Sequence, residues 1–167
     1  MKKTDTKQAM NLIMEAPIGQ YIGEDGAQIL AERACCEISL KDNEFLFHQG
    51  DLKSSFYIVT KGRLSLVKER KRDKEPHILH VLKKGDLVGE LSFIDDTPYI
   101  ESCMALGDVS VLLFKAEDFK PLITEHPQLM FDFMRAIIKR VHHTVSSIGK
   151  QQMALSDYIS SGGKGRQ

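Results

Sequence analysis

The chain has 167 residues, 42% hydrophobic and 28% charged, which is the composition of an ordinary globular domain, and no apolar run reaches the ~20 residues that a membrane helix needs. Its 23 basic and 23 acidic residues cancel, so it lacks the charge signature of a chain that binds nucleic acid directly. The first residues contain no apolar signal-peptide stretch, and we therefore expect a cytoplasmic protein without membrane contact.

The first third of the chain carries helical signals. We expect residues 1–11 to be flexible and helical pieces to follow up to about residue 33, with an interruption at Pro17 and Gly19. Cys35 and Cys36 lie beside each other without the two-residue gap of a zinc knuckle, and Cys103 stands apart. We expect all three cysteines to be free thiols that serve as small core or surface residues.

From Cys36 onward the pattern changes to short apolar runs separated by glycines. Runs of four to eight residues that are rich in Val, Ile, Phe and Leu are typical of antiparallel strands joined by tight turns. We expect a core of about eight short strands, and the runs that indicate it are EISL, EFLFHQG, SFYIVTKG, RLSLVKE, HILHVLKKG, ESCMALG and DVSVLLFK.

The last third of the chain returns to helical spacing. Residues 116–124 predict one short helix, and Pro127 suits the first turn of a longer helix because its missing N–H is not needed there. We expect this long helix to cover residues 127–159 and the tail SSGGKGRQ, residues 160–167, to be disordered.

The long helix contains a heptad series of apolar positions whose spacing alternates between four and three. Residues 134–141 are expected to pack on the chain's own barrel, and the later positions are expected to pair with a second copy of the chain. Gln152, an a position, favours an in-register parallel pair at some cost in stability. The predicted dimer interface is Met134, Ile138, Val141, Val145, Ile148, Gln152 and Leu155.

The predicted fold is therefore mainly β with flanking helices: a double-stranded β-helix, or jelly roll, of about eight strands, with N-terminal helices and a long C-terminal helix. The segments FLFHQGD, FYIVTKGRLSLV and LKKGDLVGELSFIDDTP, in residues 45–98, give this core a recognisable glycine spacing. Over about residues 12–145 the chain resembles the cyclic-nucleotide-binding domain, the sensor module of bacterial catabolite activators, protein kinase A regulatory subunits and gated ion channels. The resemblance assigns residues 12–126 to the domain itself.

The resemblance also implies a ligand site at the segment GELSF, residues 89–93, followed by Thr97-Pro98. In the family, glycine admits the ligand, the next short helix presents N–H groups to the cyclic phosphate, glutamate accepts the ribose 2′-hydroxyl and arginine pairs with the phosphate. The ligand-binding residues that this resemblance implies are Gly89, Glu90, Leu91, Ser92, Tyr99, Ile100 and Ser102.

The resemblance fails at Tyr99, which stands where the family has arginine. Charge-assisted hydrogen bonds contribute about 1.5–3 kcal/mol, so the loss predicts binding weaker by roughly tenfold to more than a hundredfold. Asp95, Asp96 and Glu101 add repulsion toward a phosphate. We expect a cyclic nucleotide to bind weakly or not at all, and Tyr99 to fill the position of the missing arginine.

Other candidate sites are less specific. His77 and His80 suggest a cupin-like metal site, but a separation of three on a strand turns the two rings to opposite faces. The run KERKRDKE, residues 68–75, is expected to be a solvated hairpin tip because its acidic residues cancel much of the basic charge. No nucleophile with an adjacent base stands out. We therefore expect the chain to bind no metal and to have no enzymatic activity.

Two functions remain. The first is a non-enzymatic regulatory sensor that forms a homodimer and signals the binding of a small molecule to a partner protein by a shift of the C-terminal helix. The second is a ligand-independent oligomerisation domain whose vestigial pocket is filled by Tyr99 and Phe93.

Overall fold

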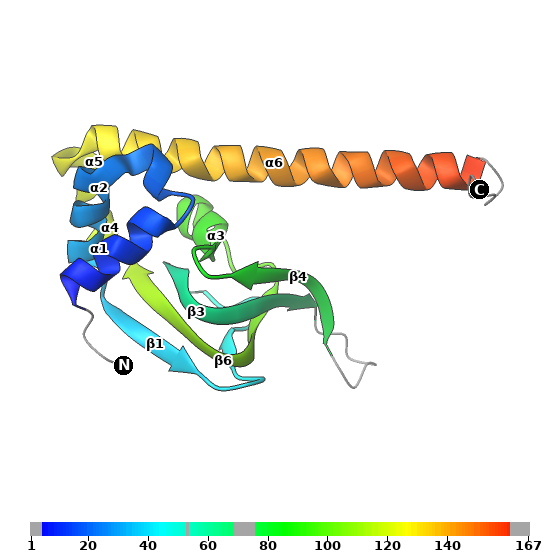
Figure 1. The fold of residues 1–167 in the computed structure, drawn as a ribbon, viewed down its shortest axis with the longest axis horizontal. Helices are drawn as coiled ribbons and strands as arrows, with labels where there is room; N and C mark the ends of the chain where they lie inside the picture. Colours follow the sequence, from blue (N-terminus) through cyan, green and yellow to red (C-terminus); the bar gives the residue numbers. More distant parts are fainter. Residues whose placement is uncertain (1–4, 53, 69–75, 161–167) are drawn as a thin grey trace.

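The N-terminal helices begin earlier than the sequence indicated. The computed structural model describes residues 5–52, 54–68 and 76–160, with α1 at Thr6–Glu15 and α2 at Gly19–Arg33 (Figure 1). The side chain of Asp5 accepts a hydrogen bond from the backbone N–H of Gln8 at 3.0 Å, which caps α1. Residues 6–11 are therefore helical rather than flexible, while residues 1–4 lie outside the described residues. The interruption predicted at Pro17 separates the two helices.

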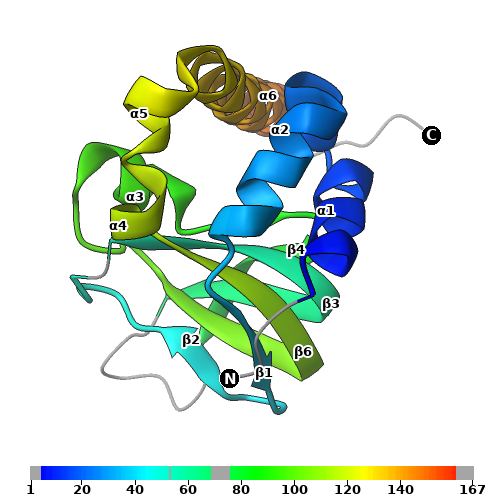
Figure 2. The same cartoon turned by 90° about the vertical axis from the view of Figure 1, so that its left-hand side faces the viewer.

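The strands form one antiparallel sheet that curls into a roll. Its order is β1-β6-β3-β4, with β2 paired to β6 and β5 paired to β3. Helices α1 and α2 lie against one end of the roll (Figure 2). The strands are β1 at Cys36–Leu40, β2 at Phe45–Phe47, β3 at Ser55–Lys68, β4 at His77–Lys83, β5 at Leu87–Val88 and β6 at Ser102–Lys115.

The structure contains fewer and longer strands than the seven apolar runs suggested. β3 covers both SFYIVTKG and RLSLVK, and β6 covers the two runs that follow Ser102, because each strand bends without leaving the ladder. The β3–β6 register shifts around Lys61, next to Gly62. Gly62 has a φ of 79°, and a Cβ there would collide with the backbone oxygen of Asp108. Glycine thus permits the bend, and six described strands form the predicted jelly roll.

Two apolar clusters hold the fold together. One joins the helices to the outer side of the sheet, where the rings of Phe119 and Phe133 lie 4.9 Å apart and Phe56 meets Phe119 edge to face at 5.2 Å. The other fills the inside of the roll and contains Cys36 and Cys103. All three cysteines, including the half-buried Cys35, are free thiols as expected.

The segment after β6 forms two short helices rather than one. α4 spans Ala116–Phe119 and α5 spans Leu122–Glu125. Pro121 lies between them and has no N–H to continue the first helix, which explains the difference from the single helix predicted over 116–124.

The long helix α6, Pro127–Ser160, starts at the predicted proline and extends far past the roll (Figure 1). Its buried side chains are confined to its first three turns: Leu129, Phe133, Ala136 and Ile137. The expected disordered tail falls almost wholly on residues 161–167, which lie outside the described residues. Among the helices that are described, none is both long and apolar enough to cross a bilayer.

Candidate functional site

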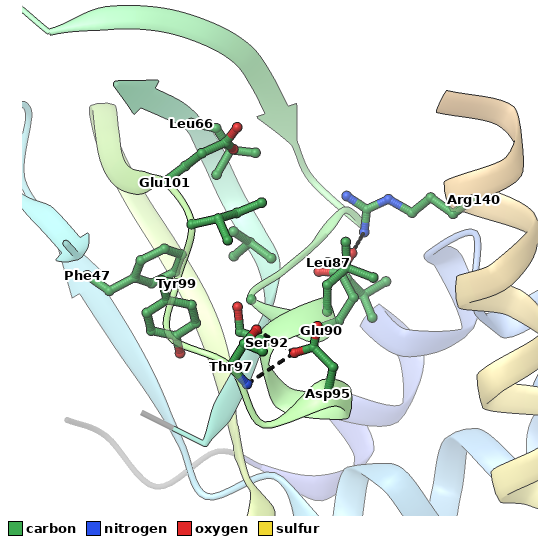
Figure 3. A pocket seen from close by; sticks show the side chains of 14 residues that line it. Phe47, Leu66, Leu87, Glu90, Ser92, Asp95, Thr97, Tyr99, Glu101 and Arg140 are labelled. Carbon is green, nitrogen blue, oxygen red and sulfur yellow. Dashed lines mark hydrogen bonds and ion pairs between the residues drawn. The ribbon is translucent and has the colours of Figure 1, made fainter. Parts of the chain in front are cut away.

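A cavity of about 190 Å³ opens at the place that the glycine motif indicated. Its walls come from β5, from the short helix α3 at Glu90–Asp95 and from the segment that leads to β6. Phe47 of β2, Leu66 of β3 and Arg140 of α6 complete it (Figure 3). Residues of five structural elements, from Phe47 to Arg140, therefore meet at this cavity.

Gly89 forms the turn between β5 and α3. Its φ is 80°, a left-handed conformation that L side chains rarely adopt. A Cβ at this position would lie 3.0 Å from Cε1 of Tyr99 and 3.1 Å from the backbone oxygen of Ser55. The close approach leaves room for glycine alone, and the turn directs Glu90 into the first position of α3.

Glu90 is buried, with 7% of its surface exposed. Its Oε1 lies 3.2 Å from Nη1 of Arg140. Burial raises the pKa of the Glu90 carboxyl, whereas Arg140 and a hydrogen bond from the residue's own backbone N–H lower that pKa, and the net direction is upward. Glu90 therefore links the first turn of α3 to Arg140 on α6.

Arg140 is a residue of the candidate site that the sequence did not indicate. It lies on α6 one turn after the buried Ile137, and its guanidinium reaches the cassette (Figure 3). Nη1 is buried and makes no aligned hydrogen bond within the described ranges, so its attraction to Glu90 is mainly electrostatic. The helical spacing could have indicated this position, because residues 133, 137 and 140 lie on one face of a helix and the first two are apolar.

Tyr99 stands at the position where the resemblance implies arginine. It is 3% exposed and stacks on Phe47 with ring centroids 3.8 Å apart. Its hydroxyl donates a hydrogen bond to the backbone oxygen of Ser55 at 2.8 Å, and burial raises its pKa. Because this proton is used within the protein, Tyr99 offers a ligand an apolar ring rather than a hydrogen bond.

The other predicted ligand residues divide into two groups. Leu91 and Ile100 line the cavity and are 44% and 69% exposed, and Ser92 lines it while donating a hydrogen bond to the oxygen of Pro98 at 3.4 Å. Ser102 does not line the cavity. It is fully buried at the start of β6, where its Oγ accepts a hydrogen bond from the backbone N–H of Gln49 at 2.8 Å. The structure thus gives Ser102 a loop-bracing position.

Three carboxylates and one guanidinium are the charged groups among the described residues that line the cavity. Asp95 accepts hydrogen bonds from the backbone N–H and the hydroxyl of Thr97 at 3.1 and 2.6 Å. Glu101 is half-buried beside Leu66, on another side of the cavity from Asp95 (Figure 3). The wall of the cavity is acidic, apart from the pair that Glu90 forms with Arg140.

The predicted dimer residues lie outside this cavity, along α6. Met134 and Val141 pack partly against the helical core, but Ile138 is 62% exposed and does not contact the barrel as expected, because the buried face of α6 runs through Ile137 instead. The later seam positions Val145, Ile148 and Leu155 are 63%, 49% and 59% exposed, and Gln152 is exposed beside them.

The suggested metal site at His77 and His80 finds no support in the geometry. Both side chains are exposed on β4, and the described residues contain no group of three side chains that could hold a metal ion. The run at residues 69–75, expected to be a hairpin tip, lies outside the described residues, although β3 and β4 on either side of it pair as antiparallel neighbours.

The architecture is thus a jelly roll with a glycine-led short helix at a cavity and a long helix behind it. The family model for the cyclic nucleotide-binding domain matches residues 37–126, and the chain belongs to this family. The resemblance inferred from the glycine spacing is thereby confirmed.

Two curated relatives illustrate the range of proteins that contain this domain. Lysophospholipase NTE1 from Chaetomium globosum is 29% identical over 104 residues, which are 62% of this chain and 7% of that protein. The cyclic AMP receptor protein from Thermus thermophilus is 29% identical over 96 residues, which are 58% of this chain and 44% of that protein. The chain thus matches only a part of each relative.

Solved structures show the same fold. The N-terminal domain of a transcriptional regulator from Streptomyces coelicolor A3(2) has a TM-score of 0.69 at 25% identity, with 82% of this chain and 94% of that chain covered. The regulatory domain of Toxoplasma gondii protein kinase A, solved with cyclic AMP, has a TM-score of 0.69 at 20% identity, with 83% and 50% covered.

Proposed function

We propose that the chain is a non-enzymatic regulatory sensor module in which a small molecule, bound at the cavity beside Gly89 and Glu90, changes the position of α6. The observation that carries this proposal is the ion pair between Glu90 and Arg140 at 3.2 Å, because it joins the cassette directly to the helix. In this proposal the shift of α6 alters the surface that a dimer presents to a partner protein.

The ion pair is suited to report on the cavity. The side chain of Glu90 is 9% exposed and that of Arg140 is 34% exposed, so the pair is only partly screened by water. A ligand that binds the Glu90 carboxylate competes with Arg140. It can shift the position of α6 only by the difference between its binding free energies with the ion pair formed and with the ion pair broken. A ligand that leaves the pair intact would shift nothing.

The coupling can be tested without any ligand. Arg140→Gln removes the cation from α6, and we expect faster amide hydrogen exchange in α3, residues 90–95, as well as around the substituted position. Lys139→Gln, an exposed neighbour on the same helix, is the matched control and should leave α3 unchanged. Faster exchange confined to α6 in the Arg140→Gln protein would contradict the coupling.

Cyclic nucleotides are expected to be poor ligands of this sensor. The position of the phosphate-pairing arginine holds Tyr99, whose hydroxyl is already bonded to Ser55. Calorimetric titration with cyclic AMP and cyclic GMP should therefore give dissociation constants in the millimolar range or no heat. A micromolar constant for either nucleotide would refute this part of the proposal.

The alternative is a ligand-independent oligomerisation domain with a vestigial pocket. The burial of Tyr99 favours it, but Phe93, which was also expected to fill the pocket, packs against the helical core and is not among the residues that line the cavity. The cavity of about 190 Å³ that remains beside Glu90 favours the sensor instead. Both functions share the proposed homodimer.

A further inference from the structure

We infer that the cavity beside Glu90 selects a small organic cation, an ammonium group on an apolar body, and excludes the anionic ligands typical of this fold. This inference rests on the proposed sensor function and specifies its ligand. It follows from the charges on the cavity wall, from the hydrogen bonds that already occupy its polar groups and from its apolar lining.

The charges of the wall oppose an anion. Glu90, Asp95 and Glu101 contribute three carboxylates, and Arg140 contributes the one positive group among the described lining residues. Arg140 is matched by Glu90 at 3.2 Å, which leaves the carboxylates of Asp95 and Glu101 without a cation on the described part of this wall. A phosphate in this cavity would face repulsion, whereas an ammonium group would be attracted.

The polar groups that usually hold a phosphate are engaged within the chain. The hydroxyl of Tyr99 donates to Ser55, and Ser92 donates to Pro98. The buried N–H of Arg140 Nη1 remains as a donor that suits a neutral oxygen on the ligand.

The rest of the lining is apolar and provides room for the body of such a ligand. The side chains of Phe47, Leu66, Val88 and Tyr99 line the cavity, and Ile100, which also lines it, has 69% of its surface exposed. Burial of an apolar body against these groups supplies affinity, and the carboxylates supply selectivity for charge.

Three probes with one body and different charges test the inference: phenethylammonium, 2-phenylethanol and phenylacetate. Each is titrated into the full chain while the amide signals of residues 89–101 are followed by NMR. We expect phenethylammonium to bind at least about tenfold more tightly than phenylacetate, with the alcohol between them. Cyclic AMP, added as a fourth probe, should bind more weakly than phenethylammonium.

A matched pair of variants assigns the effect to the cavity. Glu101→Gln keeps the shape of the side chain and should weaken phenethylammonium about two- to fivefold, with no loss for 2-phenylethanol. Glu24→Gln, an exposed carboxylate on α2, should change neither constant.

The inference is overturned if phenylacetate or cyclic AMP binds as tightly as phenethylammonium, if none of the probes shifts the signals of residues 89–101, or if Glu101→Gln does not weaken phenethylammonium. Because the exchange test of Arg140→Gln uses no ligand, a failure of the ligand class and a failure of the coupling between cavity and α6 are seen separately.

Discussion

Glu90 is the buried member of the described carboxylates that line the cavity, and its protonation is linked to stability. Burial raises the pKa of Glu90 above its ordinary value, against the opposing effects of Arg140 and a backbone N–H. The folded state therefore binds more protons than the unfolded state at pH values between the two pKa values. Over that window the free energy of unfolding falls as pH rises.

Glu90→Gln should remove this dependence. We expect the variant to have a higher free energy of unfolding than the native chain at pH 7. The difference should shrink as pH is lowered through the raised pKa to below the ordinary pKa of a glutamate carboxyl. Urea denaturation followed by circular dichroism across this range measures both curves. If the difference stayed constant with pH, the burial of a charged Glu90 would not be its cause.

Tyr99 is expected to act in packing and not in ligand recognition. Tyr99→Phe keeps the stack on Phe47 and removes the hydrogen bond to Ser55, so it should lower the free energy of unfolding by about 1 kcal/mol. Phenethylammonium binding should stay the same, since the hydroxyl is already used within the protein. A loss of binding with unchanged stability would reverse the assignment and make Tyr99 a ligand contact.

At the scale of elements, glycine spacing and apolar runs were sufficient to predict the jelly roll, the flanking helices and the start of α6 at Pro127. They could not predict that β3 and β6 each continue through a bend, because continuity depends on a partner strand that is distant in sequence. The proline at residue 121 indicated a break between α4 and α5, but the residues on both sides favour helix, and a single helix was predicted.

The candidate site was predictable where it is local and not where it is tertiary. Gly89 and Glu90 belong to one contiguous motif, and both line the cavity. Arg140 lies fifty positions later on another element, so only the packing of α6 brings it to Glu90. Ser102 has the right residue type for a ligand contact, but its hydrogen bond with Gln49, in the segment after the paired strand β2, determines its position.

The bend in β3 should depend on the absence of a side chain at residue 62. Gly62→Ala combines a positive φ with a collision against the backbone of Asp108, and we expect a loss of more than about 3 kcal/mol in the free energy of unfolding. Gly107→Ala, with a φ of 77° but open space around it, isolates the conformational cost and should lose about 1–2 kcal/mol. Equal losses in thermal denaturation would show that the close approach contributes nothing.

For the whole molecule, the notable feature is the length of α6 relative to the roll. Its buried contacts end near Ile137, yet the helix continues to Ser160 with a row of exposed apolar side chains (Figure 1). The a positions Ile138 and Val145 are β-branched, which favours a two-stranded coiled coil. A second copy of the chain is the occupant that this heptad spacing fits.

The final prediction concerns this pairing. Ile148→Asp places two carboxylates in the seam of a parallel dimer, and each lost apolar side chain removes very roughly 1.5–3 kcal/mol of burial. We expect sedimentation equilibrium to give a dimer for the native chain and the 18.9 kDa monomer for the variant.

Met153→Asp is the matched control for this experiment. Met153 is 70% exposed on α6 but follows Gln152 outside the heptad seam, so its substitution should leave the dimer intact. Dissociation by both substitutions would indicate a nonspecific loss of α6, and a native chain that sediments as a monomer at high micromolar concentration would refute the dimer. The new carboxylate of Ile148→Asp lies in the dimer seam and not beside Arg140. Amide hydrogen exchange in α3 should therefore be the same in the variant monomer as in the native dimer. Faster exchange in α3 of the monomer would show that dimerisation stabilises the Glu90–Arg140 ion pair.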